Sequence, residues 1–142
     1  MDELRPIEFY EKEAQADLTC PTHSKVPDIS GYAIRLGLLR ANWAKYLYKE
    51  ENALNILSEE LSGLYADKFR YYSYDYEYNV DKKDIPILIK GDKDYRESEL
   101  IIKNQNSKTK FIQEVLNSLN AQSFYLNTAM KHILWQSGEP AW

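Results

Sequence analysis

Residues 64–73 read LYADKFRYYS, and residues 74–92 continue as YDYEYNVDKKDIPILIKGD. This stretch separates two long segments with helical periodicity. Six of the chain's twelve tyrosines fall between positions 65 and 78, and two cations, Lys68 and Arg70, stand at its start. The sequence therefore predicts a turning point between two helices that carries aromatic rings and positive charge together.

Proline placement leaves room for a long helix before and after this turning point. No proline lies between 28 and 85 or between 87 and 139, and proline breaks helix interiors. We expect the first helix to begin at Asp28 or Ser30 as N-cap and to run to about Tyr72. Its apolar residues recur at steps of three, four and seven, as in a coiled-coil seam interrupted at Glu50. These residues are Trp43, Leu47, Leu54, Leu57, Leu61 and Leu64.

A second seam predicts the second helix, with Asp94–Glu97 as its capping box and Gly138 as its terminating residue. Further apolar residues lie outside this seam, so two such helices have more apolar surface than one hairpin can bury. We therefore expect a homo-oligomer. The residues assigned to contacts between protomers are Ile112, Val115, Leu119, Phe124, Leu126, Met130, Ile133 and Trp135.

The predicted fold class is mainly α, with two long antiparallel helices in a helical hairpin or coiled coil. The apolar run Ile85–Ile89 has high β propensity, and Pro86 allows a strand start or edge, so we expect a short β segment in the connector. Residues 1–27 form a predicted acidic N-terminal arm, mobile or docked on a partner, and residues 28–142 form the hairpin domain.

Little in the sequence favours catalysis. The chain has two histidines and one cysteine, and it lacks phosphate-loop, zinc-protease and nucleophile-elbow motifs. Cys20 and His23 supply only half of a zinc site. We expect no enzyme activity, no metal and no cofactor. No apolar run is long enough for a membrane span, the first residues do not resemble a signal peptide, and the single cysteine fits a reducing cytoplasm.

The charged aromatic stretch favours binding of single-stranded nucleic acid, in which cations meet phosphates and rings stack on bases. The candidate residues are Lys68, Arg70, Tyr71 and Tyr72, with Lys82 and Lys83 further along the connector and a second basic spot at Lys45 and Lys49. In an alternative interpretation, the tyrosines cap the end of the coiled coil, and Asp75 and Glu77 repel phosphate.

Three blocks of the chain resemble the UvsY family of recombination mediator proteins from myoviruses related to the T-even phages. The first is the helix end Leu64-Tyr-Ala-Asp-Lys-Phe-Arg-Tyr-Tyr-Ser73, and the second is the connector end Asp84-Ile-Pro-Ile-Leu-Ile-Lys-Gly-Asp92. The third is the C-terminal block 122–130. The family's basic pair before Tyr-Tyr is reduced here to Lys68, because Ala66 takes the first position, and Gln122-Ser123 replaces a family Arg-Gly. Both departures lower the expected DNA affinity.

The resemblance implies a small helical protein that assembles into a ring of six or seven subunits. Such a protein binds single-stranded DNA, relieves the barrier posed by the phage single-strand-binding protein, and helps to load a RecA-like recombinase of the UvsX type. It has no enzymatic activity and acts in DNA recombination, repair and replication in the cytoplasm of the infected bacterium.

Two other classes remain as alternatives. A prefoldin-like chaperone also has two long helices, but its β connector is usually longer than residues 73–94. A structural coiled-coil scaffold protein would need no tyrosine–cation cluster. Binding to a single-stranded oligonucleotide distinguishes a mediator from both of these classes.

Overall fold

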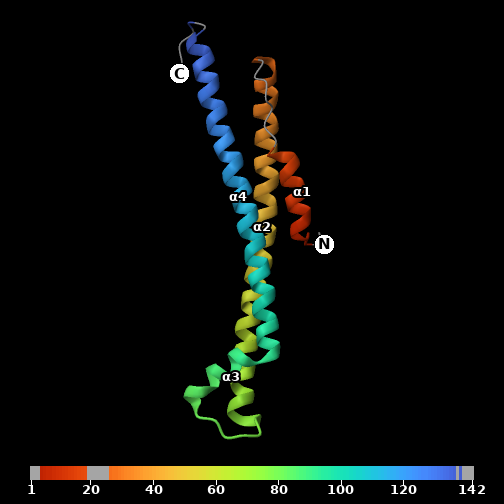
Figure 1. Ribbon diagram of the computed structural model, residues 1–142, viewed down its shortest axis with the longest axis vertical. Coiled ribbons are helices and arrows are strands. Elements are labelled where there is room, and N and C mark those ends of the chain that lie inside the picture. The colour runs from red at the N-terminus through yellow and green to blue at the C-terminus, as the bar shows by residue number, and fades with distance from the viewer. Residues whose placement is uncertain (1–3, 19–25, 137, 139–142) are drawn as a thin grey trace. The chain divides into compact units, whose positions relative to one another are not determined.

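The computed structural model describes residues 4–18, 26–136 and 138, and of residues 26–30 it describes the backbone alone. Every element in these ranges is helical and none is a strand (Figure 1). The described chain forms two compact units, unit 1 from residues up to 49 and from 110 onward, and unit 2 from residues 50–109. The elements are α1 (Ile7–Asp17), α2 (Val26–Arg70), η1 (Tyr71–Asp75), η2 (Lys82–Asp84), α3 (Ile85–Gly91) and α4 (Lys93–Gln136).

The two long helices are confirmed. Helix α2 has 45 residues and α4 has 44, and within each unit their segments run antiparallel (Figure 1). Helix α2 begins at Val26, earlier than the predicted N-caps Asp28 and Ser30. Pro27 permits this start because the first turn of a helix does not use the amide that proline lacks.

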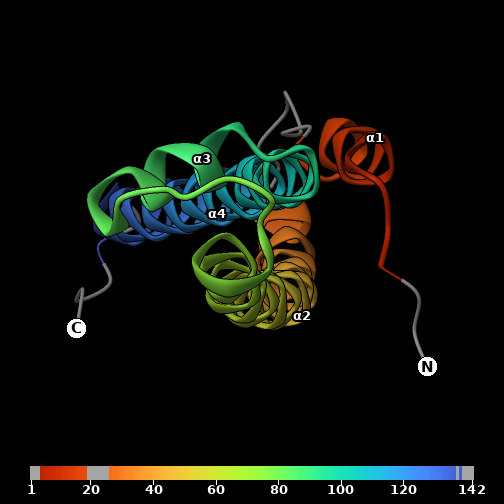
Figure 2. The same ribbon diagram turned by 90° about the horizontal axis from the view of Figure 1, so that it is seen from below.

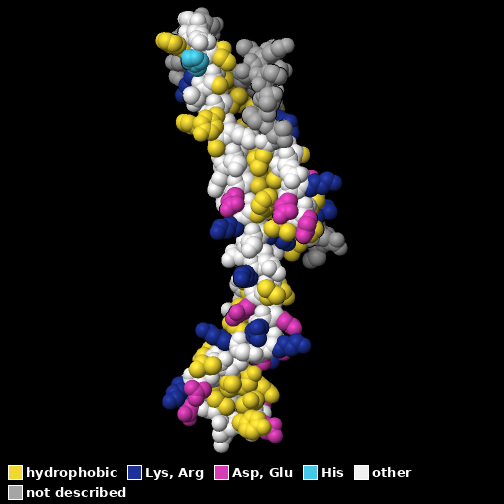
Figure 3. Space-filling model, viewed as in Figure 1, with side chains coloured by type: hydrophobic (Ala, Val, Ile, Leu, Met, Phe, Trp, Pro, Cys, Tyr) yellow, Lys and Arg dark blue, Asp and Glu magenta, His cyan; other side chains and the backbone are white. Residues whose placement is uncertain are grey.

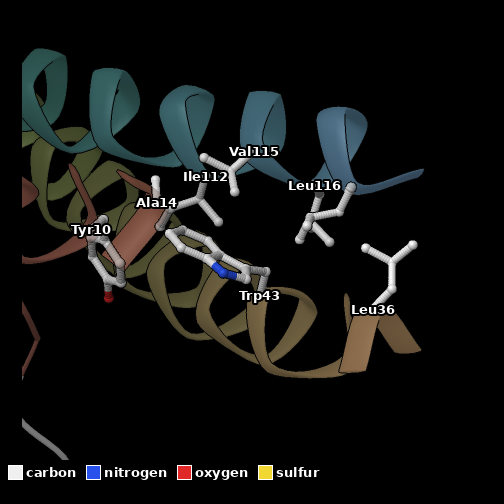
Figure 4. Packing of buried hydrophobic residues seen from close by; sticks show 8 residues of the cluster. Tyr10, Ala14, Leu36, Trp43, Ile112, Val115 and Leu116 are labelled. Carbon is white, nitrogen blue, oxygen red and sulfur yellow. The ribbon is translucent and has the colours of Figure 1, made fainter. Parts of the chain in front are cut away.

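Unit 1 has an apolar core that α1, α2 and α4 share. Trp43 of α2 is fully buried, and Tyr10 of α1 is 1% exposed. The two rings lie 6.0 Å apart between centroids, and the Trp43 indole donates a hydrogen bond to Asp17 Oδ2 at 3.0 Å. Figure 4 shows most of this cluster, which comprises Tyr10, Ala14, Leu36, Trp43, Ile112, Val115, Leu116 and Leu119.

Helix α1 therefore corrects the expectation of a mobile or partner-docked arm. Tyr10 and Ala14 lie one helical turn apart and enter the core of the chain's own hairpin. Gln122 of α4 donates a hydrogen bond to the Leu18 carbonyl at 3.2 Å, at the end of α1. Over residues 7–18 the acidic segment is part of unit 1, while residues 19–25 lie outside the described residues.

Unit 2 contains a polar layer where the seam is interrupted. Glu50 is fully buried, and its Oε2 accepts hydrogen bonds from Gln105 Nε2 at 2.6 Å and from Lys108 Nζ at 3.3 Å. Gln105 also donates to the Glu50 carbonyl at 2.9 Å. A buried carboxylate is tolerated because a cation and hydrogen-bond donors meet it.

The far end of unit 2, which we call the tip, comprises residues 64–95. Here α2 changes into the π-helical turn η1, in which the Tyr76 amide donates to the Tyr71 carbonyl at 2.8 Å. Figure 2 shows the connector running on to α3, which leads into α4. Helix α3 packs on η1 and η2, and its Ile85 and Ile89 are fully buried.

The predicted β segment at Ile85–Ile89 is wrong, because these residues form α3. Pro86 lies in the first turn of that helix, a position that suits its fixed φ. Ile85 and Ile89 are spaced four residues apart, so one helical face carries both side chains inward. Burial of that face outweighs the β preference of isoleucine.

The caps of α4 were predicted correctly at one end. Gly138 has a φ of 80°, the left-handed conformation of a residue that terminates a helix. At the other end Asp94 is not the cap. The Oδ1 atom of Asp92 accepts the amides of Asp94 at 3.0 Å and Tyr95 at 3.3 Å, so Asp92 caps the helix.

Candidate nucleic-acid interface

Lys68 lies in the last turns of α2 and is held by two carboxylates. Its Nζ is 3.0 Å from Asp94 Oδ2 and 3.3 Å from Asp92 Oδ2. The Lys68 side chain is 20% exposed and that of Asp92 is 12% exposed. The cation that the sequence assigned to phosphate is therefore largely neutralised within the protein.

Asp92 is the hub of the tip. Besides capping α4 through Oδ1, it accepts a hydrogen bond from the Tyr72 hydroxyl on Oδ2 at 2.8 Å. One carboxylate thus joins the end of α2, the turn η1 and the start of α4. Sequence reasoning missed this role, although an aspartate directly after Gly91 is a typical helix-start signal.

Four tyrosines form a chain of edge-to-face ring contacts. Ring centroids are 5.1 Å apart for Tyr71 and Tyr72, 5.0 Å for Tyr72 and Tyr76, and 5.6 Å for Tyr76 and Tyr78. Because η1 is π-helical, Tyr71 and Tyr76 also meet, at 6.0 Å. The ammonium of Lys68 lies 5.9 Å from the Tyr71 ring centroid. These four rings therefore pack against one another at the tip.

The pKa values at the tip follow from these contacts. Burial, the hydrogen bond to Asp92 and its charge raise the pKa of Tyr72 to about 12. Burial alone would raise the pKa of Asp92, but hydrogen bonds from Tyr72, the Tyr95 amide and Lys68 outweigh it and lower that pKa. The hydrogen bond to Asp94, opposed by burial, raises the pKa of Lys68. All three groups keep their usual protonation state at neutral pH.

The other residues predicted to bind DNA differ from Lys68 in their exposure, their ion pairing or the unit to which they belong. Arg70 is exposed, and in the part of the chain that the structure describes it makes no ion pair. Tyr71 is 44% exposed, whereas Tyr72 is half-buried. Lys45 and Lys49 belong to unit 1 and so form a separate basic spot. Figure 3 shows hydrophobic side chains gathered over the tip, with charged side chains around them.

The residues assigned to protomer contacts separate into two groups. Ile112, Val115 and Leu119 lie in the core of unit 1 and are at most 3% exposed. Phe124 is 67% exposed and Trp135 is 73% exposed. Leu126, Met130 and Ile133 are half-buried. The end of α4 therefore carries the apolar side chains that remain accessible.

Other kinds of site find no support in the described residues. Within these ranges no group of three or more His, Cys, Asp or Glu side chains could hold a metal ion. Cys20 and His23 lie outside the described residues. No helix in the described chain is both long and apolar enough to cross a membrane.

Comparison with known proteins is informative at the level of the structure. No family model matches the chain, and no curated protein matches it. Among solved structures, it is similar to the crystal structure of the bacteriophage T4 recombination mediator protein UvsY. The TM-score is 0.77, with 93% of this chain and 99% of the UvsY chain covered. The chain has the UvsY fold.

This likeness confirms at the level of the fold the resemblance that the three sequence blocks indicated. Sequence identity to T4 UvsY is only 12%, so most side chains differ between the two proteins. The comparison therefore concerns the backbone fold, and the chemistry of the tip follows from this chain's own residues.

Proposed function

We propose that this protein is a recombination mediator without enzymatic activity. It binds single-stranded DNA and promotes loading of a RecA-like recombinase onto DNA covered by a single-strand-binding protein. The observation that carries the proposal is the UvsY fold over 93% of the chain. Two of the three blocks that carry the family resemblance, 64–73 and 84–92, fall in the tip.

Charge at the tip is compatible with this role. Lys68 is paired, but Arg70, Lys82 and Lys83 add cations that form no ion pair among the described residues. Two acidic residues of the tip, Asp92 and Asp94, are engaged by Lys68. Pairing thus removes part of the negative potential that a phosphate would meet.

Assembly into a ring-like homo-oligomer is part of the proposal. The accessible apolar side chains at the end of α4, Phe124, Tyr125 and Trp135, supply the protomer contact. Bulky aromatic residues of this kind are typical anchors of protein interfaces. The recombinase of the UvsX type and the single-strand-binding protein are the proposed partners, in the cytoplasm of an infected bacterium.

The test is binding of a single-stranded oligonucleotide, measured by fluorescence anisotropy at several salt concentrations. A mediator binds the single strand with a salt-dependent affinity and little sequence preference, and it prefers that strand to the matching duplex. It also raises the rate at which a RecA-like recombinase fills DNA covered by single-strand-binding protein. A protein that shows no binding at low salt is a scaffold or chaperone instead.

A further inference from the structure

A groove opens at the tip between the end of α2 and the connector. It is open to solvent, has a volume of about 450 Å³ and is lined by side chains from α2, η1 and η2. Sites of about 300–1,000 Å³ hold small organic ligands, so the volume suits a single nucleotide. Its principal lining residues are Tyr65, Phe69, Arg70, Ser73, Tyr74 and Lys82.

The groove has a positive lining. Arg70 and Lys82 come from different elements, and neither makes a hydrogen bond or an ion pair that the described residues show. No carboxylate lines the groove, although Asp81 and Asp84 flank the pair Lys82-Lys83 in sequence. Lys68 contrasts with both, because two aspartates already hold it.

The groove also offers an aromatic ring that no other ring covers. Tyr74 is 81% exposed and is absent from the ring contacts that join Tyr71, Tyr72, Tyr76 and Tyr78. An exposed ring beside cations is the arrangement with which proteins stack single-stranded bases.

The π-helical turn η1 supplies part of the groove wall, because Ser73 and Tyr74 belong to it. The bond from the Tyr76 amide to the Tyr71 carbonyl spans five residues instead of four, and π-helical turns occur frequently at functional sites. The Ser73 hydroxyl in the groove wall is buried and has no hydrogen-bond partner among the described residues.

We propose that this groove binds one nucleotide unit of single-stranded DNA, with Arg70 and Lys82 on the phosphate and Tyr74 stacked on the base. Lys68 is a positioning residue that holds the tip together through Asp92 and Asp94. This assignment rests on the proposed function. It moves phosphate contact away from Lys68, the position to which the family resemblance points.

The first experiment compares two double variants of the full chain by anisotropy with a labelled oligothymidine between 50 and 200 mM salt. Arg70→Ala/Lys82→Ala removes the groove cations, and Lys90→Ala/Lys93→Ala removes two other exposed cations of the tip. Each cation that engages a phosphate contributes about 0.7 to the slope of log affinity against log salt. Loss of two contacts therefore lowers the slope by about 1.4. The fold-loss of affinity between 50 and 200 mM salt is then about sevenfold smaller in the variant than in the wild type.

The outcomes separate the groove from the proposed function. A wild-type chain that does not bind the oligonucleotide overturns the proposed function. A wild-type chain that binds, with both double variants equally weakened or equally unaffected, overturns the groove alone. The single variant Lys68→Ala should keep the wild-type slope while its thermal unfolding temperature falls. A flattened slope in Lys68→Ala contradicts its role as a positioning residue.

A second experiment locates the base. An oligonucleotide with 5-iodouracil is crosslinked by light, and the modified residue is identified by mass spectrometry. We expect the crosslink at Tyr74, and Tyr74→Ala should weaken binding about 5- to 150-fold with the salt slope unchanged, as for loss of one stacked base. Crosslinks at Tyr71 or Tyr72 instead would overturn the assignment of the base to Tyr74.

Discussion

Replacement of Asp92 by alanine should destabilise the tip more than the replacement of any other charged residue of the tip. The substitution removes the N-cap of α4, which costs about 1 kcal/mol. It also removes the acceptor of the Tyr72 hydroxyl, a hydrogen bond to a charged group that contributes about 1.5–3 kcal/mol. Lys68 keeps its ion pair with Asp94 at 3.0 Å, so the variant loses little ion-pair stabilisation at Lys68. The expected total is about 3 kcal/mol.

Asp94→Ala is the matched control, since it removes the same charge and the other partner of Lys68. Asp94 is 65% exposed and neither caps α4 nor meets Tyr72, so its loss should cost about 1 kcal/mol or less. Native-state hydrogen exchange at the end of α2 and the start of α4 reports the local opening free energy in both variants. The hub role of Asp92 is refuted if the two variants open equally easily, or if Asp92→Ala stays within about 0.5 kcal/mol of wild type.

Three further predictions concern other parts of the chain. The tip should loosen at high pH, because the pKa of Tyr72 is raised in the folded state. The stability that this shift contributes is complete below the ordinary pKa of 10.0 and is lost as pH rises past about 12. Near-ultraviolet circular dichroism should follow this loss in the wild type, and the Tyr72→Phe variant should lack it. Tyr10→Ala should lower the free energy of unfolding in urea by about 3–5 kcal/mol, as for loss of a buried aromatic. The control Tyr48→Ala, at a position 69% exposed, should change it by no more than about 0.5 kcal/mol. Equal effects would show that α1 adds nothing to the core. Trp135→Ala should lower the mass in sedimentation with helicity unchanged, and a ring of unaltered mass would exclude Trp135 as an anchor.

Much of the fold could be predicted because it depends on local rules. Proline-free intervals and apolar repeats give two long helices, and Gly138 ends the second by its own conformational freedom. Ile85–Ile89 was misread because a short apolar run has no decisive periodicity. Its helical state depends on two isoleucines, Ile85 and Ile89, both fully buried.

The candidate site was only partly predictable because its chemistry depends on pairings across the tip. Lys68 meets Asp92 and Asp94, which are 24 and 26 positions away in sequence. A count of charges along the chain treats that lysine as available. In sequence Tyr74 is one of several tyrosines between positions 65 and 78, and only the structure shows that it is exposed and outside the ring contacts of Tyr72 and Tyr76.

The buried carboxylate of Glu50 has a consequence for how α2 and α4 can align within unit 2. A slide by one heptad, about 10.5 Å, would keep apolar stripes in contact. It would also carry Gln105 and Lys108 away from Glu50, and Ser98 or Ile112 would take the place of Gln105. An unpaired buried charge costs about 3–5 kcal/mol, so slipped alignments are strongly disfavoured. An apolar side chain at position 50 would remove this penalty and let neighbouring alignments compete. The polar layer thus specifies the register of α2 against α4 within unit 2.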